Sequence, residues 1–234
     1  MERKNVLLDL DGTLLPIDID EFLKGYFYLL GKEFSDLWEP DFFIDSLMKA
    51  THKMIANNGK NFNMDVFKEA FFQLLEHDDK DIIMDRFEKF YLNKFPTLQS
   101  GILVDDLPVR LIATLKEKGY NLVLATNPLF PLIAIEERLR WAKLDIKDFS
   151  LITTYENMHY CKPNPEYYLE ITKKIQAEPS NCIMIGNDVQ EDMIATAELG
   201  MKTFLVNDYL IDRKEDEINV DWQGSLEELV EYFS

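Results

Sequence analysis

Cysteine and basic residues are scarce in this 234-residue chain. Its two cysteines, Cys161 and Cys182, are too few for a disulfide framework, so we expect a reducing compartment, the cytoplasm. Lysine and arginine total 25 against 43 aspartate and glutamate residues, and the formal net charge is −18. Nucleic acid and anionic membranes attract positive surfaces, so this balance argues against both as partners. A small anionic substrate remains compatible, because a bound divalent cation inverts the local field.

Long hydrophobic runs are also missing. No apolar stretch approaches the roughly 20 residues that cross a bilayer. The charged start of the chain leads directly into a short apolar run, so we expect no signal peptide. Yet 47% of the residues are hydrophobic, which is enough for a sizeable core. The length suits one large domain, or a core with a modest insertion.

The segment 5–14 carries the strongest chemical signal. Its apolar run 6–8 predicts a strand buried on both faces of a parallel sheet, and Asp9, Asp11 and the turn-forming Gly12 follow. Side chains alternate along a strand, so the two carboxylates should lie on one side, where their repulsion calls for a cation or a shared proton. Taken alone, the pattern also fits an ordinary Asp-Gly turn. An EF-hand calcium loop does not fit, because the glycine comes too early.

Residues 16–104 change from strand-like to helical spacing of their apolar residues. Turn-forming sequences at 39–40, 57–59 and 77–79 divide the segment into four helices. Aromatic residues recur on the predicted inner faces, and we interpret them as packing residues rather than substrate contacts. The sequence therefore predicts a helical insertion with an aromatic-rich interior.

From residue 105 onward, helical and strand-like segments alternate. The predicted strands are 121–126, 149–153, 182–186 and 203–206. The predicted helices are 106–118, 129–142, 190–199, one that starts at Pro163 and Pro165, and one after the capping box of Ser225 and Glu228. This alternation predicts an α/β fold with a doubly wound, parallel, Rossmann-like sheet. We expect the core to comprise 1–15 and 105–234, and the insertion 16–104 to cover the carboxyl edge of the sheet as a lid.

Polar side chains also follow the later strands. Thr126 and Asn127 end the second strand, Lys162 precedes the helix after the third, and 187–188 end the fourth, with Asp192 beyond. Each has an ordinary explanation: Thr126 as a helix cap, Lys162 as a surface lysine, residue 188 as a helix cap and Asp192 as a solvated acid. Open α/β sheets bind ligands beyond the carboxyl ends of their strands. Four polar groups at that one edge therefore favour a catalytic site.

These residues resemble the four ordered motifs of the haloacid dehalogenase (HAD) superfamily. The matching stretches are Asp9-Leu10-Asp11-Gly12-Thr13, Thr126, Lys162 and Gly186-Asn187-Asp188 with Asp192. The resemblance spans about residues 5–206, and the insertion is similar to the superfamily's C1-type cap. It implies a Mg²⁺-dependent phosphatase that acts on a small phosphorylated metabolite, a phosphate monoester.

The resemblance also implies a role for each catalytic residue. Asp9 would attack phosphorus and form an aspartyl-phosphate. Asp11 would protonate the leaving alkoxide and then take a proton from the hydrolytic water. Thr126 and Asn127 would hold the phosphoryl oxygens, and Lys162 would offset negative charge.

A Mg²⁺ site follows from the same resemblance. Its implied members are Asp9, the Leu10 carbonyl, Asp11, Asp188 and the supporting Asp192. Relatives usually carry an acid directly after the glycine of the fourth motif, where this chain has Asn187. Asn187 is therefore the alternative to Asp188 as a ligand. Histidines 52, 77 and 159 have no spacing typical of a metal site.

Three other functions compete with a phosphatase. A dehalogenase is disfavoured, because a departing halide needs no proton and Asp11 would have no task. A phosphomutase of the β-phosphoglucomutase-like branch shares all four motifs and differs in how the cap excludes water. A protein that only binds phosphorylated metabolites would keep the fold without turnover. The identity of the ester and the oligomeric state do not follow from the sequence.

Overall fold

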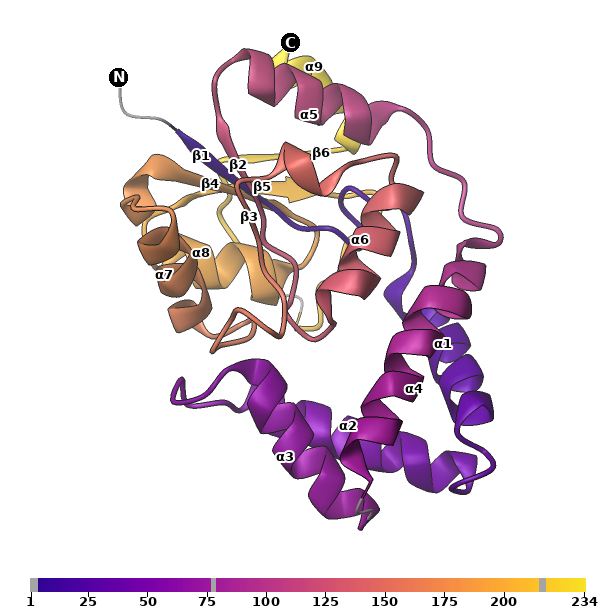
Figure 1. Ribbon diagram of the computed structural model, residues 1–234. Helices are drawn as coiled ribbons and strands as arrows, with labels where there is room; N and C mark the ends of the chain where they lie inside the picture. The colour runs from indigo at the N-terminus through magenta and orange to yellow at the C-terminus, as the bar shows by residue number, and fades with distance from the viewer. Residues whose placement is uncertain (1–3, 77–78, 215–217) are drawn as a thin grey trace.

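The protein, seen in a computed structural model, is built around a six-stranded parallel sheet (Figure 1). The structure describes residues 4–76, 79–214 and 218–234. The strands follow the spatial order β3-β2-β1-β4-β5-β6. Their bounds are β1 Asn5–Leu8, β2 Asn121–Leu124, β3 Leu151–Ile152, β4 Cys182–Gly186, β5 Lys202–Val206 and β6 Trp222–Gly224. The predicted doubly wound α/β class is confirmed.

Alternate residues of β1 enter two separate cores, as a strand with both faces covered requires. Val6 and Leu8 pack in the cluster that includes α5 (Leu107–Glu117), α6 (Leu132–Trp141) and α9 (Leu226–Phe233). Leu7 packs on the opposite face with α7 (Pro165–Lys174) and the segment around α8 (Ala195–Ala197). The two faces together leave β1 without exposed side chains.

The strand order reverses at β1. The chain adds β2 and β3 on one side of β1 and then returns to place β4, β5 and β6 on the other. Such a reversal leaves a crevice beyond the carboxyl ends of the two strands that flank it, here β1 and β4. The topology therefore sets the residues after β1 beside those after β4.

Four helices form the insertion between β1 and α5: α1 Ile19–Glu33, α2 Pro40–Ile55, α3 Asn63–Leu75 and α4 Lys80–Asn93, followed by a 3₁₀ turn, η1, at Phe95–Gln99. They stand apart from the sheet, below it in Figure 1. Their interior is aromatic, as predicted: the rings of Phe34 and Phe43 stack with centroids 4.5 Å apart. Of the predicted turn at 77–79, only Asp79 lies within the described residues.

Several element boundaries differ from the sequence predictions. The predicted helix 190–199 is instead a π-helical turn, η4 (Val189–Ile194), followed by the short α8. Asp188 caps this turn through the Glu191 N–H. The three-residue β6 was not predicted, because a segment this short has little periodicity. Short 3₁₀ turns at Ile146–Asp148 and Pro179–Asn181 precede β3 and β4.

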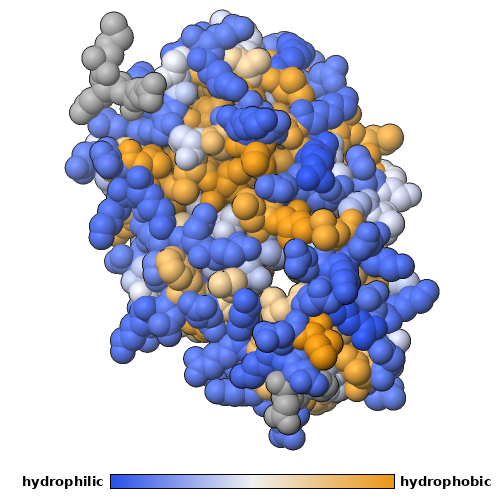
Figure 2. All heavy atoms as spheres, in the orientation of Figure 1, coloured by the Kyte–Doolittle hydropathy of each residue, from blue (hydrophilic) through white to orange (hydrophobic). Residues whose placement is uncertain are grey.

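The cysteines, the helix lengths and the surface complete the description of the fold. Cys161 and Cys182 are both buried and free. None of the helices in the described ranges combines the length and the apolar character that crossing a membrane requires. On the face shown in Figure 2, polar residues cover most of the insertion, and hydrophobic residues gather on the core.

Candidate active site

The carboxyl end of β1 places Asp9 at the centre of the sheet edge. The Asp9 N–H donates to the Ile185 carbonyl at 2.9 Å, which extends the pairing with β4 by one residue. The chain then turns at Gly12, whose φ is +80°. A Cβ there would lie 2.3 Å from Asn187 Nδ2, so only glycine permits this approach of the two loops.

Lys162 forms buried ion pairs with two of the predicted aspartates. Its Nζ donates to Asp9 Oδ1 at 2.8 Å and to Asp192 Oδ1 at 2.6 Å, and the lysine is 2% exposed. Burial by itself would lower the pKa of Lys162, but Asp192 and Asp9 outweigh burial and hold that pKa well above its ordinary value. Lys162 is therefore a charged, buried residue between two carboxylates rather than a surface lysine.

The three polar residues after β4 have different partners. Asp192 accepts from Lys162 and, through Oδ2, from the Asp188 N–H at 3.2 Å. The Asp188 carboxylate caps the following turn and pairs with Arg213 at 2.5 Å. Asn187 Oδ1 lies 3.1 Å from the Thr13 hydroxyl, and its Nδ2 donates to the Tyr209 carbonyl at 2.6 Å. Residue 188 thus has the helix-capping role that was its ordinary explanation.

Asp11 is paired with Arg138 of α6. The guanidinium binds Asp11 Oδ2 and is 1% exposed, while the Asp11 side chain is 14% exposed. Its charged carbon also lies 4.5 Å above the centre of the Phe130 ring. Burial raises the pKa of Asp11, against the opposing effect of Arg138 and with a further increase from Asp9. Within the described chain, Asp11 Oδ1 and Arg138 Nη2 have no hydrogen-bond partner.

Of the predicted phosphate-binding residues, Asn127 contacts Lys162 directly, and Thr126 precedes Asn127 in the chain. Thr126 is buried two residues after β2, and its carbonyl accepts from the hydroxyls of Thr153 and Tyr167. The Asn127 side chain is occupied at both ends: Oδ1 accepts from the Lys162 N–H at 3.3 Å, and Nδ2 donates to Glu191 at 3.1 Å. Asn127 therefore fixes the backbone of Lys162.

The contacts of the predicted metal ligands make some of these residues more suitable than others to hold Mg²⁺. Across residues 4–76, 79–214 and 218–234, no three histidine, cysteine, aspartate or glutamate side chains are grouped to hold a metal ion. The Leu10 carbonyl accepts the N–H groups of Thr13 and Leu15. By contrast, Asp9 Oδ2 and Asn187 Oδ1 lie 3.4 and 3.1 Å from the same Thr13 hydroxyl. A carboxylate and an amide oxygen face one space there, and such hard oxygen ligands suit Mg²⁺.

Sequence reasoning missed three residues of this site. Arg138, Thr13 and Arg213 each contact a predicted acid or amide. No motif or spacing marked Arg138 or Arg213. Thr13 belongs to the aspartate motif, but no role was predicted for its hydroxyl. Arg138 falls among the charged residues of a helix, where the expected explanation is a solvated face, and nothing in the local pattern distinguishes it.

Known proteins resemble this chain along nearly its whole length. Pyrophosphatase PpaX from Bacillus cereus (strain Q1) is 21% identical over 207 residues, covering 88% of this chain and 84% of the relative. The magnesium-bound HAD-hydrolase YfnB from Bacillus subtilis has a TM-score of 0.57 at 22% identity, covering 99% of each chain. A 2-haloacid dehalogenase from Pseudomonas syringae pv. Tomato DC3000 has a TM-score of 0.66 at 17% identity, covering 98% of this chain and 97% of that one.

The structural similarities establish the fold and leave the chemistry open, since a dehalogenase and phosphatases share it. The decisive comparison is with a family model. The model of haloacid dehalogenase-like hydrolases matches residues 4–200, which include every candidate catalytic residue described above. This chain therefore belongs to the haloacid dehalogenase-like hydrolase family.

Proposed function

We propose that this hydrolase is a Mg²⁺-dependent phosphatase of small phosphate monoesters, with the insertion 16–104 acting as a C1-type cap over a core of 1–15 and 105–234. The observation that carries the proposal is the buried Lys162, which binds Asp9 and Asp192 at 2.8 and 2.6 Å. A cation held against the first carboxylate positions it for attack and offsets the charge of an arriving phosphoryl group.

Asp9 is the nucleophile in this proposal. Its carboxylate attacks phosphorus, the bond to the ester oxygen breaks, and an aspartyl-phosphate forms. Asp11 gives its proton to the departing alkoxide and then removes one from the water that hydrolyses the intermediate. The raised pKa of Asp11, caused mainly by burial, favours the protonated form that the first step needs. A halide would leave without this proton, so the Asp11 position favours phosphoryl transfer over dehalogenation.

Lys162 and the loop after β2 complete the phosphoryl site. We propose that Thr126 and the N–H groups beside it hold the non-bridging oxygens, while Asn127 holds Lys162 in place through its backbone. Asp192 balances the charge of Lys162 and fixes its Nζ. These groups stabilise charge in a largely buried site, where such interactions are stronger than in water.

Mg²⁺, when bound, offsets negative charge on Asp9 and on the phosphoryl oxygens. We propose Asp9 and Asn187 as its side-chain ligands, because their oxygens lie beside the same Thr13 hydroxyl. The Leu10 carbonyl is a weaker candidate because it already accepts two backbone N–H groups. Asp188 and Asp192 are likewise weaker candidates, because Arg213 and Lys162 occupy their carboxylates.

Phosphate release from a panel of esters tests the proposal. The panel contains sugar phosphates, nucleotides, phosphoglycolate and an aryl phosphate, each assayed with Mg²⁺ and with EDTA. We expect Mg²⁺-dependent release by the native protein and none by Asp9→Asn, which keeps the shape of the residue and loses its nucleophilic charge. Release at the native rate by Asp9→Asn would refute the covalent mechanism. An isomerised sugar phosphate would instead favour a phosphomutase, and tight binding without turnover a binding protein.

A further inference from the structure

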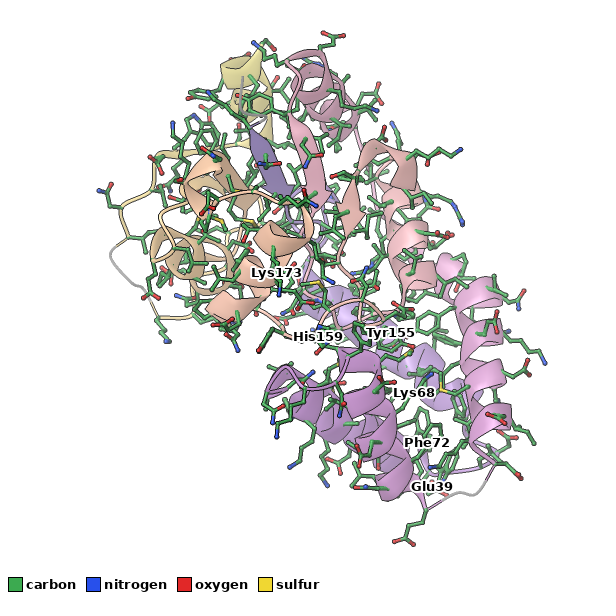
Figure 3. The ribbon with its side chains drawn as sticks, turned by 60° about the vertical axis from the view of Figure 1, so that its left-hand side comes forward. Glu39, Lys68, Phe72, Tyr155, His159 and Lys173 are labelled. Atoms are coloured by element: carbon green, nitrogen blue, oxygen red, sulfur yellow. The ribbon has the colours of Figure 1, made fainter. Side chains whose placement is uncertain are left out.

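A cavity of about 170 Å³ lies between the insertion and the core. All four helices of the insertion contribute to its wall, and two core loops close it: Leu129–Pro131 after β2, and the loop of Tyr155 after β3. Figure 3 shows Tyr155 at the junction of the two parts. The Met64 N–H of α3 donates to the Tyr155 carbonyl at 2.8 Å, so the insertion is hydrogen-bonded to this loop.

The wall of this cavity is mostly apolar, and Thr51 and His52 contribute polar side chains to it. Among the described residues that line it, none is lysine, arginine, aspartate or glutamate. The hydroxyls of Tyr26 and Tyr91 lie 2.8 Å apart and bind each other. Burial raises the pKa of Tyr26 to about 12, so the pair is neutral at physiological pH. Such a wall favours apolar groups and disfavours ions, because an ion would lose its hydration without a partner.

The cavity lies near Asp11, the residue that we assign as proton donor, without contacting it directly. Leu129 and Phe130, in its wall, lie two and three residues beyond Asn127. The Phe130 ring lies against the Arg138 guanidinium, and Arg138 binds Asp11. A single aromatic ring and one guanidinium thus separate the cavity from the carboxyl group that would protonate the leaving oxygen.

The volume sets the size of the occupant. In a well-studied engineered protein, an apolar cavity of about 150 Å³ binds benzene. At about 170 Å³, the cavity described here has room for one six-membered ring or a compact aliphatic group. Resting on the phosphatase function proposed above, we propose that this cavity binds the alcohol part of the substrate. The substrate class is then a phosphate monoester whose alcohol carries one aromatic ring or a compact apolar group.

This class differs from the pyrophosphate that the name of the PpaX relatives indicates for those proteins. The leaving group of pyrophosphate is itself an anionic phosphate, and binding it calls for cationic side chains. The described lining of the cavity offers no lysine or arginine, and its basic side chain is the imidazole of His52. The chemistry of the wall therefore separates the two substrate classes.

The test compares 2-phenylethyl phosphate with ethyl phosphate and with pyrophosphate. The two alcohols have similar acidity, so the esters differ mainly in the ring. Burying the ring should raise kcat/KM by about 10- to 100-fold over ethyl phosphate, the range expected for burying a large apolar side chain. Equal kcat/KM values for the two esters, or a preference for pyrophosphate, would overturn the inference.

Two tryptophan variants of α4 link this preference to the cavity. Met84 lines it, and Met84→Trp should fill it and lower the ratio of the two kcat/KM values. Ile82, two residues earlier, is 62% exposed, and Ile82→Trp should leave the ratio unchanged. A ratio that Met84→Trp leaves at the native value would also overturn the inference.

Binding of 2-phenylethanol alone, measured by calorimetry on the native protein, supplies a readout that needs neither turnover nor a folded variant. Saturable binding that phosphate does not displace supports the cavity as the site, and no binding contradicts it. The phosphatase function fails separately, if none of the phosphate esters is hydrolysed in Mg²⁺. If polar esters are hydrolysed and the ring gives no preference, the phosphatase function is supported and only the apolar substrate class is refuted.

Discussion

Replacing Lys162 with methionine tests whether one buried cation holds the site together. The lysine is 2% exposed and binds both Asp9 and Asp192, so Lys162→Met leaves two buried carboxylates without their cation. Removing one partner of a buried ion pair costs about 3–5 kcal/mol. For a chain of this length, that loss corresponds to a fall in Tm of about 6–20 °C. Catalysis should also fall sharply, because the variant loses the buried cation that offsets charge on Asp9 and the phosphoryl group together with Mg²⁺.

Thermal unfolding of four proteins measures this effect. Lys173→Met, which removes an exposed lysine of α7, is the matched control and should change stability by no more than about 0.5 kcal/mol. The double variant Lys162→Met with Asp192→Asn should regain part of the lost Tm. Asparagine keeps the shape of aspartate and removes one of the two negative charges that would otherwise repel each other. The reasoning is refuted if Lys162→Met unfolds at the native Tm, or if the double variant is no more stable than the single one.

The pH dependence of the same variant gives a second check. Burial already raises the pKa of Asp192 to about 7, against the opposing effect of Lys162, and removing the lysine would raise it further. A carboxyl group with a raised pKa binds more protons in the folded than in the unfolded state, so its contribution to stability increases as pH falls. The Tm gap between native protein and Lys162→Met should therefore narrow from pH 8 to pH 5.5. A gap that widens over this range would contradict the assignment.

Two further variants test the acid and the metal ligands. Arg138→Met should destabilise the protein by about 3 kcal/mol, because it leaves the buried Asp11 unpaired. It should also shift the high-pH decline of kcat/KM to higher pH, because losing the cation raises the pKa of Asp11; a shift to lower pH would contradict the proton-donor role. Asn187→Ala should raise the Mg²⁺ concentration needed for half-maximal stabilisation in thermal unfolding, while Asp188→Asn should leave it near the native value. The reverse order would make Asp188 the ligand.

The strands and the alternation of elements are local properties, and the sequence predicted them well. The apolar run 6–8 has no polar position, so it could only be a strand covered on both faces, and β1 is one. The boundaries were less accurate where a tertiary contact competes with periodicity. The segment 190–199 has helical spacing of its apolar residues, yet its first part is the π-helical turn 189–194. This turn contains Asp192, which binds Lys162.

The candidate site residues could also be proposed from the sequence, because they are the residues that follow each strand. Parallel strands bring their carboxyl ends to one edge, so the sequence alone was enough to expect Asp9, Thr126 and Lys162 together. Their partners could not be expected in this way. Nothing near Asp11 in the chain indicates Arg138, which lies 127 residues away and meets it only when α6 packs on the sheet.

The roles of residues 187 and 188 show the same limit. Both are polar, adjacent and at the end of β4, so the sequence could not decide which of them faces Asp9. The tertiary structure separates them, because Arg213 and the turn after β4 occupy Asp188, while Gly12 admits Asn187 beside Thr13. The order of residue types along the chain thus determined the fold and the hydrolase family. Only the packing of distant segments decided which side chain meets which, since that depends on contacts with no local signature.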